Sequence, residues 1–131
     1  MSVRQIAAQK LMDKAAVTQA GTSYSDVMVF ERCTGVATVK LVATSVGAAT
    51  ITISQQCSLN YDSNYPARAT WYDPIDASGV AKGVVGTAVA MTAGKYISYN
   101  PILTPYIRFK VVEGNTAAAV VSLTLFFQEE I

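Results

Sequence analysis

The stretch "PYIRFKVVEGNTAAAVVSLTLFF", residues 105–127, holds two runs of alternating side chains. Successive side chains of a strand point to opposite sides, so every second residue from Ile107 to Val111 falls on one apolar face. The same spacing from Val121 to Phe127 gives the second run an apolar face of its own. The intervening "EGNT" contains glycine and asparagine, which tolerate turn dihedrals. The stretch therefore predicts two strands joined as a β-hairpin.

Short runs with a period of two recur along the chain after Gly21, and glycine, proline and asparagine separate them. The candidate strands read "VMVFER", "ATVKLVAT", "ATITISQQ", "ARATWYD", "GTAVAMT", "KYISY", "YIRFKVV" and "VVSLTLFF". No helical segment lies between them, whereas parallel strands would require long crossover connections. We predict an all-β domain over residues 21–131, an antiparallel β-sandwich or jelly roll of about eight strands.

Residues 1–20 show a different spacing. The apolar residues between Val3 and Leu11 recur at helical intervals, Ser2 and Gln5 fit a capping box, and a glycine follows the segment. A short N-terminal helix or arm is therefore predicted. Its apolar face is thin, so the segment either reaches a neighbouring subunit or closes one end of the fold.

The charge balance limits the classes of partner. The 131 residues carry ten Lys plus Arg and nine Asp plus Glu, a net charge of +1 without a basic stripe, so we expect no nucleic-acid partner. No apolar run approaches the roughly 20 residues of a membrane helix, and the charged N-terminus lacks the apolar core of a signal peptide. We expect no membrane partner and no export by the general pathway. Only 15% of the residues are charged, below the roughly 25% usual in soluble domains, so we expect part of the neutral surface to be covered.

Cys33 and Cys57 are the two cysteines of the chain. They would be able to pair if their strands lay side by side. Two thiols in a chain without a secretion signal are more often reduced and buried, where they pack as small hydrophobic side chains.

The absence of histidine removes the commonest general base, the commonest metal ligand and the base of the usual serine or cysteine triads. A glycosidase needs only two carboxylates at a suitable separation. The candidate carboxylates for such a pair are Glu31, Asp62, Asp73, Asp76 and Glu113. A domain of this size leaves little room for a catalytic cleft, so we expect no enzymatic activity and no cofactor.

The densest group of polar and aromatic residues is "NYDSNYPARATWYDPIDASG", residues 60–79. We take it as a candidate interaction patch that consists of Tyr61, Tyr65, Arg68, Trp71 and Tyr72. Tyrosine, tryptophan and arginine are enriched where proteins anchor one another.

Three other interpretations of this segment remain open. Tyr65, Trp71 and Tyr72 would stack on sugar rings if they lay exposed on one flat patch, as in a carbohydrate-binding module. Asp73 and Asp76 are candidate calcium ligands, although "DPIDASG" lacks the alternating acids of an EF-hand loop. In the simplest alternative, Trp71 packs in the core and the flanking residues form turns.

The stretches "TWYDPIDASGVAKGVV", residues 70–85, and "NPILTPYIRFKVVEGNTAAAVVSLTLFFQ", residues 100–128, carry a family resemblance. Together they resemble the small β-sandwich virion proteins of tailed bacteriophages. The resemblance implies a protein without catalytic residues that works as a multimer on a capsid or tail. It implies a structural virion protein, made in the host cytoplasm, that decorates or cements the head by binding the major capsid protein or other virion proteins. The alternatives are a neck, tail or head-fibre subunit, or a carbohydrate-binding module.

The strand edges lead us to expect a homo-oligomer, with a trimer as the preferred form. The candidate strands "ATITISQQ" and "VVSLTLFF" contain no charged residue. If either lies at the edge of a sheet, a neighbouring subunit is expected to cover it, because unpaired strand edges are usually blunted or covered. If both lie inside their sheets, no oligomer is needed.

Overall fold

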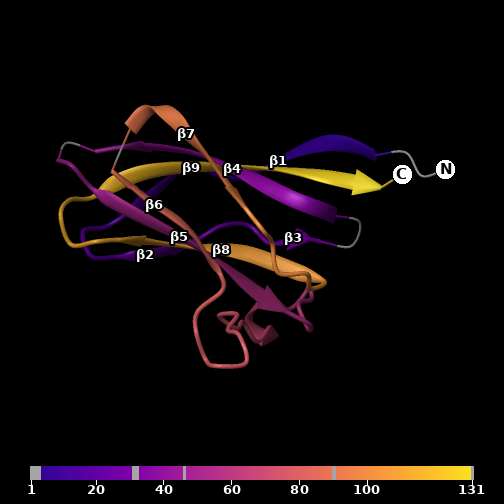
Figure 1. Cartoon of the computed structure of the whole chain (residues 1–131). Coiled ribbons are helices and arrows are strands. Elements are labelled where there is room, and N and C mark those ends of the chain that lie inside the picture. Colours follow the sequence, from indigo (N-terminus) through magenta and orange to yellow (C-terminus); the bar gives the residue numbers. More distant parts are fainter. Residues whose placement is uncertain (1–3, 31–32, 46, 90, 131) are drawn as a thin grey trace.

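The computed structural model describes residues 4–30, 33–45, 47–89 and 91–130, and these form two antiparallel sheets packed face to face (Figure 1). The strands are β1 Arg4–Val17, β2 Thr22–Tyr24, β3 Met28–Val29, β4 Cys33–Thr44, β5 Thr50–Ser58, β6 Val84–Val89, β7 Met91–Tyr99, β8 Tyr106–Glu113 and β9 Ala119–Glu130. Within the described ranges the only helical element is the short 3-10 turn Pro66–Arg68. The predicted all-β sandwich is confirmed, and the described residues form nine strands in place of the expected eight or so.

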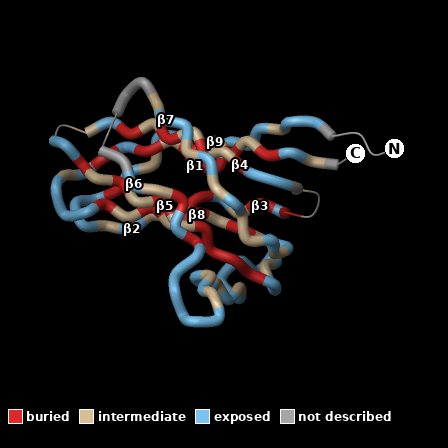
Figure 2. The backbone as a smooth tube through the Cα atoms, viewed as in Figure 1, coloured by how far each residue is buried: buried red, intermediate tan, exposed pale blue. Residues whose placement is uncertain are grey.

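The first sheet has the strand order β1-β9-β4-β7, and the second has the order β2-β8-β5-β6, with β3 also paired to β8. The core lies between them. Burial along β8 alternates strictly, so that Ile107, Phe109 and Val111 are fully buried while the intervening residues are not. Figure 2 shows the same alternation of buried and less buried residues along the central strands.

The predicted β-hairpin over residues 105–127 is wrong, although both of its strands exist. β8 pairs with β2, β3 and β5, whereas β9 pairs with β1 and β4 in the opposite sheet. The connection at residues 114–118, which we call the β8–β9 arch, therefore crosses from one sheet to the other. Alternation shows which side of a strand is apolar. It does not show whether two such strands pair within one sheet or pack across the core from opposite sheets, because both arrangements bury the apolar sides.

The predicted N-terminal helix is also wrong where the structure describes it. Residues Arg4–Val17 form β1, which pairs antiparallel with β9 from Arg4 opposite Glu130 to Val17 opposite Ala119. Register shifts along this pairing place Leu11 and Met12 in the core together. Pairing with β9 buries these two side chains in the core. A helix with so thin an apolar face would have buried less. Residues 1–3, which contain the proposed cap, lie outside the described residues.

One predicted strand is absent, and the open question about the strand edges is answered. "ARATWYD", residues 67–73, is not a strand: it follows the Pro66 turn and makes one isolated bridge, between Tyr72 and Cys57. The uncharged stretches "ATITISQQ" and "VVSLTLFF" form most of β5 and β9, which lie inside their sheets, so neither needs a covering subunit. The edges are β1 and β7 in one sheet and β2 and β6 in the other.

Glu113, at the end of β8, closes the arch end of the sandwich and is only 2% exposed. Four backbone amides donate hydrogen bonds to its carboxylate at 2.7–3.2 Å. They belong to Ala20, Thr50, Thr116 and Ala117. Burial alone would raise the pKa of Glu113, but these donors outweigh burial and lower the pKa. The carboxylate thus joins three separate segments of backbone.

Both cysteines are free thiols, Cys57 buried and Cys33 partly buried, on strands of different sheets. Burial, with a smaller contribution from the charge of Glu129, raises the pKa of Cys33 to about 11. The Cys33 thiol therefore stays protonated at neutral pH, as expected for a side chain that serves packing.

Candidate functional site

The outer face of the second sheet, which points away from the first sheet, carries the side chains that alternate with the core residues. Directly opposite residues of an antiparallel pair share a face. Gln56 of β5 lies opposite Arg108 of β8, and Tyr24 of β2 lies opposite Lys110. All four therefore lie on the outer face.

The β5–β6 loop, residues 59–83, extends below the sheet in Figure 1 and then returns beside β5. Cys57 and Tyr72 exchange two backbone hydrogen bonds of 3.0 and 2.9 Å, which fix the returning segment against the strand. Tyr72 shares the face of Cys57, so its neighbours Trp71 and Asp73 lie on the side of Gln56. This short paired segment brings the tryptophan to the outer face.

The guanidinium group of Arg108 lies between two aromatic rings. Its central carbon is 4.0 Å from the ring centroid of Tyr24 and 4.4 Å from that of Trp71. Its Nε donates a 2.8 Å hydrogen bond to Oε1 of Gln56, whose Nε2 donates a 3.0 Å bond to Oδ1 of Asp73. Burial lowers the pKa of Arg108, with Tyr24 and Asp73 opposing, and the group remains charged at neutral pH.

Two tyrosines extend this arrangement. The ring of Tyr61 lies 6.1 Å from Trp71 and 5.6 Å from Tyr106, tilted against both. Such aromatic pairs add about 1 kcal/mol each beyond their buried area. We call the whole group the Arg108 cluster: Tyr24, Gln56, Tyr61, Trp71, Asp73, Tyr106 and Arg108.

The structure divides the candidate patch predicted from the sequence. Tyr61 and Trp71 enter the Arg108 cluster. Tyr65 and Arg68 form a separate stack, with 4.1 Å between the guanidinium carbon and the ring centroid. Tyr72 is 62% exposed and lines a different, apolar cleft beside Leu59 and Ile102.

Sequence reasoning missed Tyr24, Gln56, Tyr106 and Arg108 as members of the site. They come from three strands that are far apart in the chain, and only the sheet pairing joins them. The outward position of Arg108 in the alternation of β8 was the one available signal. The interpretation of Trp71 as a core residue does not describe it either, because the ring is partly exposed and packs on Arg108 outside the core.

The rings proposed for sugar binding do not share a platform. No ring contact joins Tyr65, Trp71 and Tyr72 to one another, and the structure describes all three. Arg108 covers one face of Trp71, and Arg68 stacks on Tyr65. Sugar stacking needs an open face, so this geometry does not favour a carbohydrate site here.

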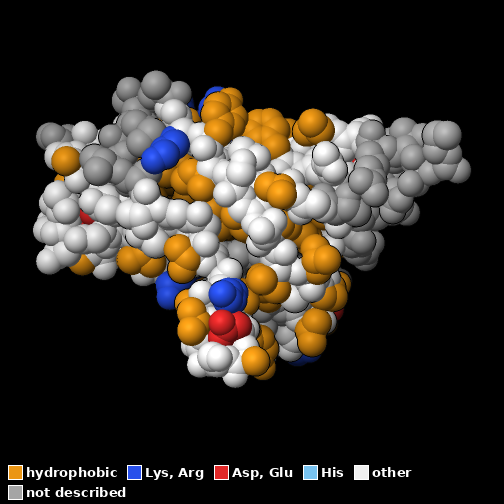
Figure 3. All heavy atoms as spheres, in the orientation of Figure 1, with side chains coloured by type: hydrophobic (Ala, Val, Ile, Leu, Met, Phe, Trp, Pro, Cys, Tyr) orange, Lys and Arg blue, Asp and Glu red, His pale blue; other side chains and the backbone are white. Residues whose placement is uncertain are grey.

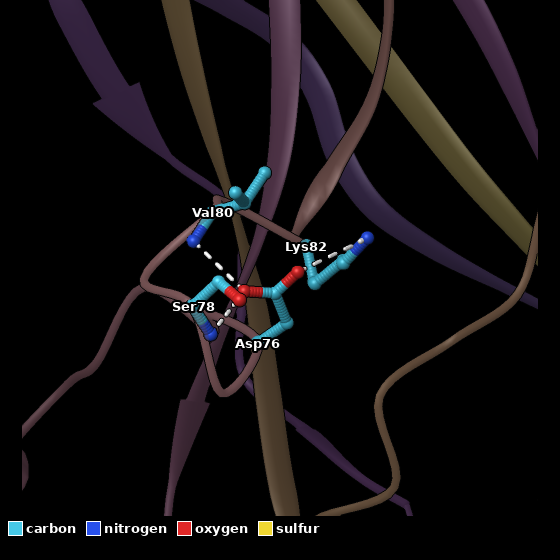
Figure 4. Close-up of polar contacts among 4 residues, drawn as sticks. All are labelled: Asp76, Ser78, Val80 and Lys82. Atoms are coloured by element: carbon cyan, nitrogen blue, oxygen red, sulfur yellow. Dashed lines mark hydrogen bonds and ion pairs between the residues drawn. The ribbon is translucent and has the colours of Figure 1, made fainter.

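The acidic side chains considered for calcium have other hydrogen-bond partners. Oδ1 of Asp76 accepts bonds of 2.8 and 3.0 Å from the amides of Ser78 and Val80, and Oδ2 lies 3.6 Å from Nζ of Lys82 (Figure 4). The bond from Val80 is the largest of the contributions that lower the pKa of Asp76. Asp73 accepts its bond from Gln56. Among the described residues no group of three His, Cys, Asp or Glu side chains is placed to hold a metal ion.

The carboxylates considered for glycoside hydrolysis are dispersed. Glu113 is enclosed in the arch end, and Asp62 accepts a 2.9 Å hydrogen bond from the amide of Asn64 in the β5–β6 loop. Glu31 lies outside the described residues. Asp62, Asp76 and Glu113 thus accept hydrogen bonds from backbone amides, and Asp73 accepts one from the side chain of Gln56.

A groove of about 230 Å³ adjoins the Arg108 cluster on the outer face. Ser54 and Lys110 contribute to its floor, and Asp73, Pro74 and Val84 line it from the β5–β6 loop and β6. Lys110 follows Arg108 by two residues on the same face of β8, so the groove continues the site along the strand.

The fold and the site define a β-sandwich protein with an aromatic and arginine cluster on one sheet. No helix formed by the described residues has the length and apolar character of a membrane span. No family model matches the sequence, and no curated protein matches it.

Several solved structures are similar to this chain. The SPBc2 prophage-derived protein YomS has 10% identity and a TM-score of 0.49, over 97% of this chain and 96% of that one. The Yersinia pseudotuberculosis-derived mitogen has 14% identity and a TM-score of 0.41, over 93% and 86%. The CBM22-1–GH10 modules of Clostridium thermocellum xylanase 10B, in complex with xylohexaose, have 10% identity and a TM-score of 0.47, over 96% of this chain and 24% of that one. Likeness at this level carries no argument about function.

Proposed function

We propose that this chain is a non-enzymatic structural protein of a bacteriophage virion, a decoration protein that binds the major capsid protein or another protein of the head through the Arg108 cluster. The observation that supports this most is the stack of Tyr24, Arg108 and Trp71. Arginine and large aromatic side chains are the groups that anchor protein interfaces. Here they are held in place before any partner arrives, which reduces the entropy lost on binding.

The stretches that carry the family resemblance also supply much of this site. Residues 70–85 contribute Trp71 and Asp73, and residues 100–128 contribute Tyr106 and Arg108. Only 15% of the residues are charged, and on the face seen in Figure 3 the charged side chains form isolated spots among neutral and hydrophobic ones. A subunit that is present in many copies works with modest contacts of this kind, because repeated contacts add avidity.

The proposed protein is a homo-oligomer, with a trimer as the preferred form. β1 is a long edge strand whose described residues hold a single ion pair, between Lys10 and Asp13 at 2.9 Å. Such an edge offers unpaired backbone groups to a second copy. Light scattering on the purified protein measures the assembly directly, and a monomer at all concentrations would contradict this part of the proposal.

Antibody labelling of intact virions, viewed by electron microscopy, tests the function. We expect label over the whole head. Label confined to the neck, tail or fibres would replace decoration with the alternative virion positions, and virions without label would overturn the proposal. Turnover of ester, glycoside or phosphate substrates by the purified protein would overturn the non-enzymatic role.

A further inference from the structure

We infer that the Arg108 cluster and the adjoining groove form a carboxylate-binding site, and that the partner inserts the side chain of an aspartate or glutamate there. This inference rests on the proposed function, because it names the chemical group by which the partner is recognised. It follows from the hydrogen bonds, charges and shape of the site.

The guanidinium group of Arg108 is oriented but incompletely bonded. The rings of Tyr24 and Trp71 pack on it, with 4.0 and 4.4 Å between its central carbon and their centroids, so a partner reaches it by its remaining N–H groups. Its Nε donates to Gln56, and no acceptor among the described residues bonds to the two terminal nitrogens. A planar carboxylate matches the edge of a guanidinium group and accepts two parallel hydrogen bonds from it.

The local charge favours a single negative group. Arg108 and Lys110 lie on the same face of β8, and neither forms an ion pair with a described carboxylate. Asp73 is the nearby acid, and its Oδ1 is bonded to Gln56. Two cations against one anion leave a local excess of one positive charge. That excess suits a carboxylate, whereas a nucleic-acid backbone requires a wider basic surface.

The groove gives room for the rest of an acidic side chain. Its volume is about 230 Å³, and Lys110, Pro74 and Val84 are among the residues that line it. The apolar lining suits the methylene groups of the side chain, and Lys110 attracts its charge. Lys110 lines the groove and lies two residues from Arg108 on the same face of β8, so both cations are available to an acidic side chain there.

Titration with blocked tetraglutamate, with tetraglutamine as the neutral control, tests the inference. Trp71 is the only tryptophan of the chain, so its fluorescence reports on the stack, and amide shifts in two-dimensional NMR spectra report on β8. We expect saturable changes with tetraglutamate that weaken as salt is added. Equal responses to both peptides would overturn the inference, and a stronger response to oligoglucuronate would assign the site to acidic sugars.

The test variants are Arg108→Gln and Lys110→Gln. The control is Lys82→Gln, which replaces an exposed lysine outside the groove lining. We expect the dissociation constant for tetraglutamate to rise about tenfold in Arg108→Gln and several-fold in Lys110→Gln, with no change in Lys82→Gln. The NMR spectra establish that each variant is folded, and Lys110→Gln keeps the test valid if Arg108→Gln unfolds. Unchanged binding in both groove variants would overturn the inference.

The two proposals fail in different ways. If virions carry the protein and Arg108→Gln rebinds stripped virions as tightly as the unaltered chain, the carboxylate site is wrong and the virion role stands. If virions lack the protein while tetraglutamate binds in an Arg108-dependent manner, the virion role is wrong and the site stands.

Discussion

Glu113 and Arg108 lie on the same strand and face opposite sides of it. Glu113 points inward at the arch end, where four backbone amides bond to its carboxylate. Arg108 points outward, where two rings and one amide oxygen fix its orientation and leave its terminal nitrogens without a described acceptor. A charge whose bonds are all made inside the chain serves the fold. A charge that is held in place but not fully bonded is suited to bind something else.

The largest effect is expected at Glu113. In Glu113→Gln the negative charge is lost and an NH₂ group replaces one acceptor oxygen, so that even if the remaining oxygen faces Ala20, Thr116 and Ala117, the buried amide of Thr50 loses its acceptor. We expect the thermal midpoint, measured by circular dichroism, to fall by roughly 10 °C or more. The matched control is Glu129→Gln, a more exposed acid on β9. If the thermal midpoint fell equally in the two variants, the special role of Glu113 in stabilising the fold would be contradicted.

The pH dependence of stability provides the second test. The folded-state pKa of Glu113 lies below the usual 4.5, so its contribution to stability is full above that pH and is lost as pH falls through the folded-state pKa. We therefore measure the free energy of unfolding in urea from neutral pH down to pH of about 3. As the pH falls, this free energy should decrease more steeply for the unaltered chain than for Glu113→Gln. Asp76→Asn, which removes an exposed acid with a lowered pKa, controls for the remaining carboxylates. Parallel pH curves for the unaltered chain and Glu113→Gln would count against the carboxylate bonds.

A smaller effect on stability is expected at Arg108. Replacement by lysine keeps the charge but loses the flat group that fits between Tyr24 and Trp71. We expect Arg108→Lys to reduce the free energy of unfolding by about 1 kcal/mol and to shift Trp71 emission to longer wavelength. If Arg108→Lys lost as much free energy of unfolding as Glu113→Gln, Arg108 would serve the stability of the fold as Glu113 does, and the contrast between the two residues would not hold.

The smallest effect is expected at the turn of Asp76. Its ion pair with Lys82 spans 3.6 Å at the surface, and exposed pairs contribute about 0.5 kcal/mol or less. Lys82→Gln should leave the urea midpoint almost unchanged. A large loss would mean that the β5–β6 loop depends on this pair more than on the backbone bonds to Asp76.

Local alternation predicted most strands correctly but not their partners. The spacing of Ile107, Phe109 and Val111 identifies the buried side of β8, yet says nothing about whether β9 lies beside β8 or across the core. At the N-terminus, the helical spacing before Leu11 was sparse, and pairing with β9 overrode it.

The site was predictable only in part for the same reason. Tyr61 and Trp71 stand out in a segment rich in aromatic residues, and both belong to the Arg108 cluster. Tyr24 and Gln56 give no local signal, because their role depends on the pairing of β2 and β5 with β8.

The pairing of β1 with β9 has a consequence for how the chain reaches its native state. Arg4 lies opposite Glu130, so the first and last described strands are neighbours in one sheet. Because β9 also lies between β1 and β4, this sheet is assembled only after β9 has been synthesised. Contacts between residues so distant in the chain are typical of slow folding, on the scale of milliseconds to seconds. Until β9 is in place, the backbone edges of β1 and β4 that pair with it remain free to pair with other nascent chains.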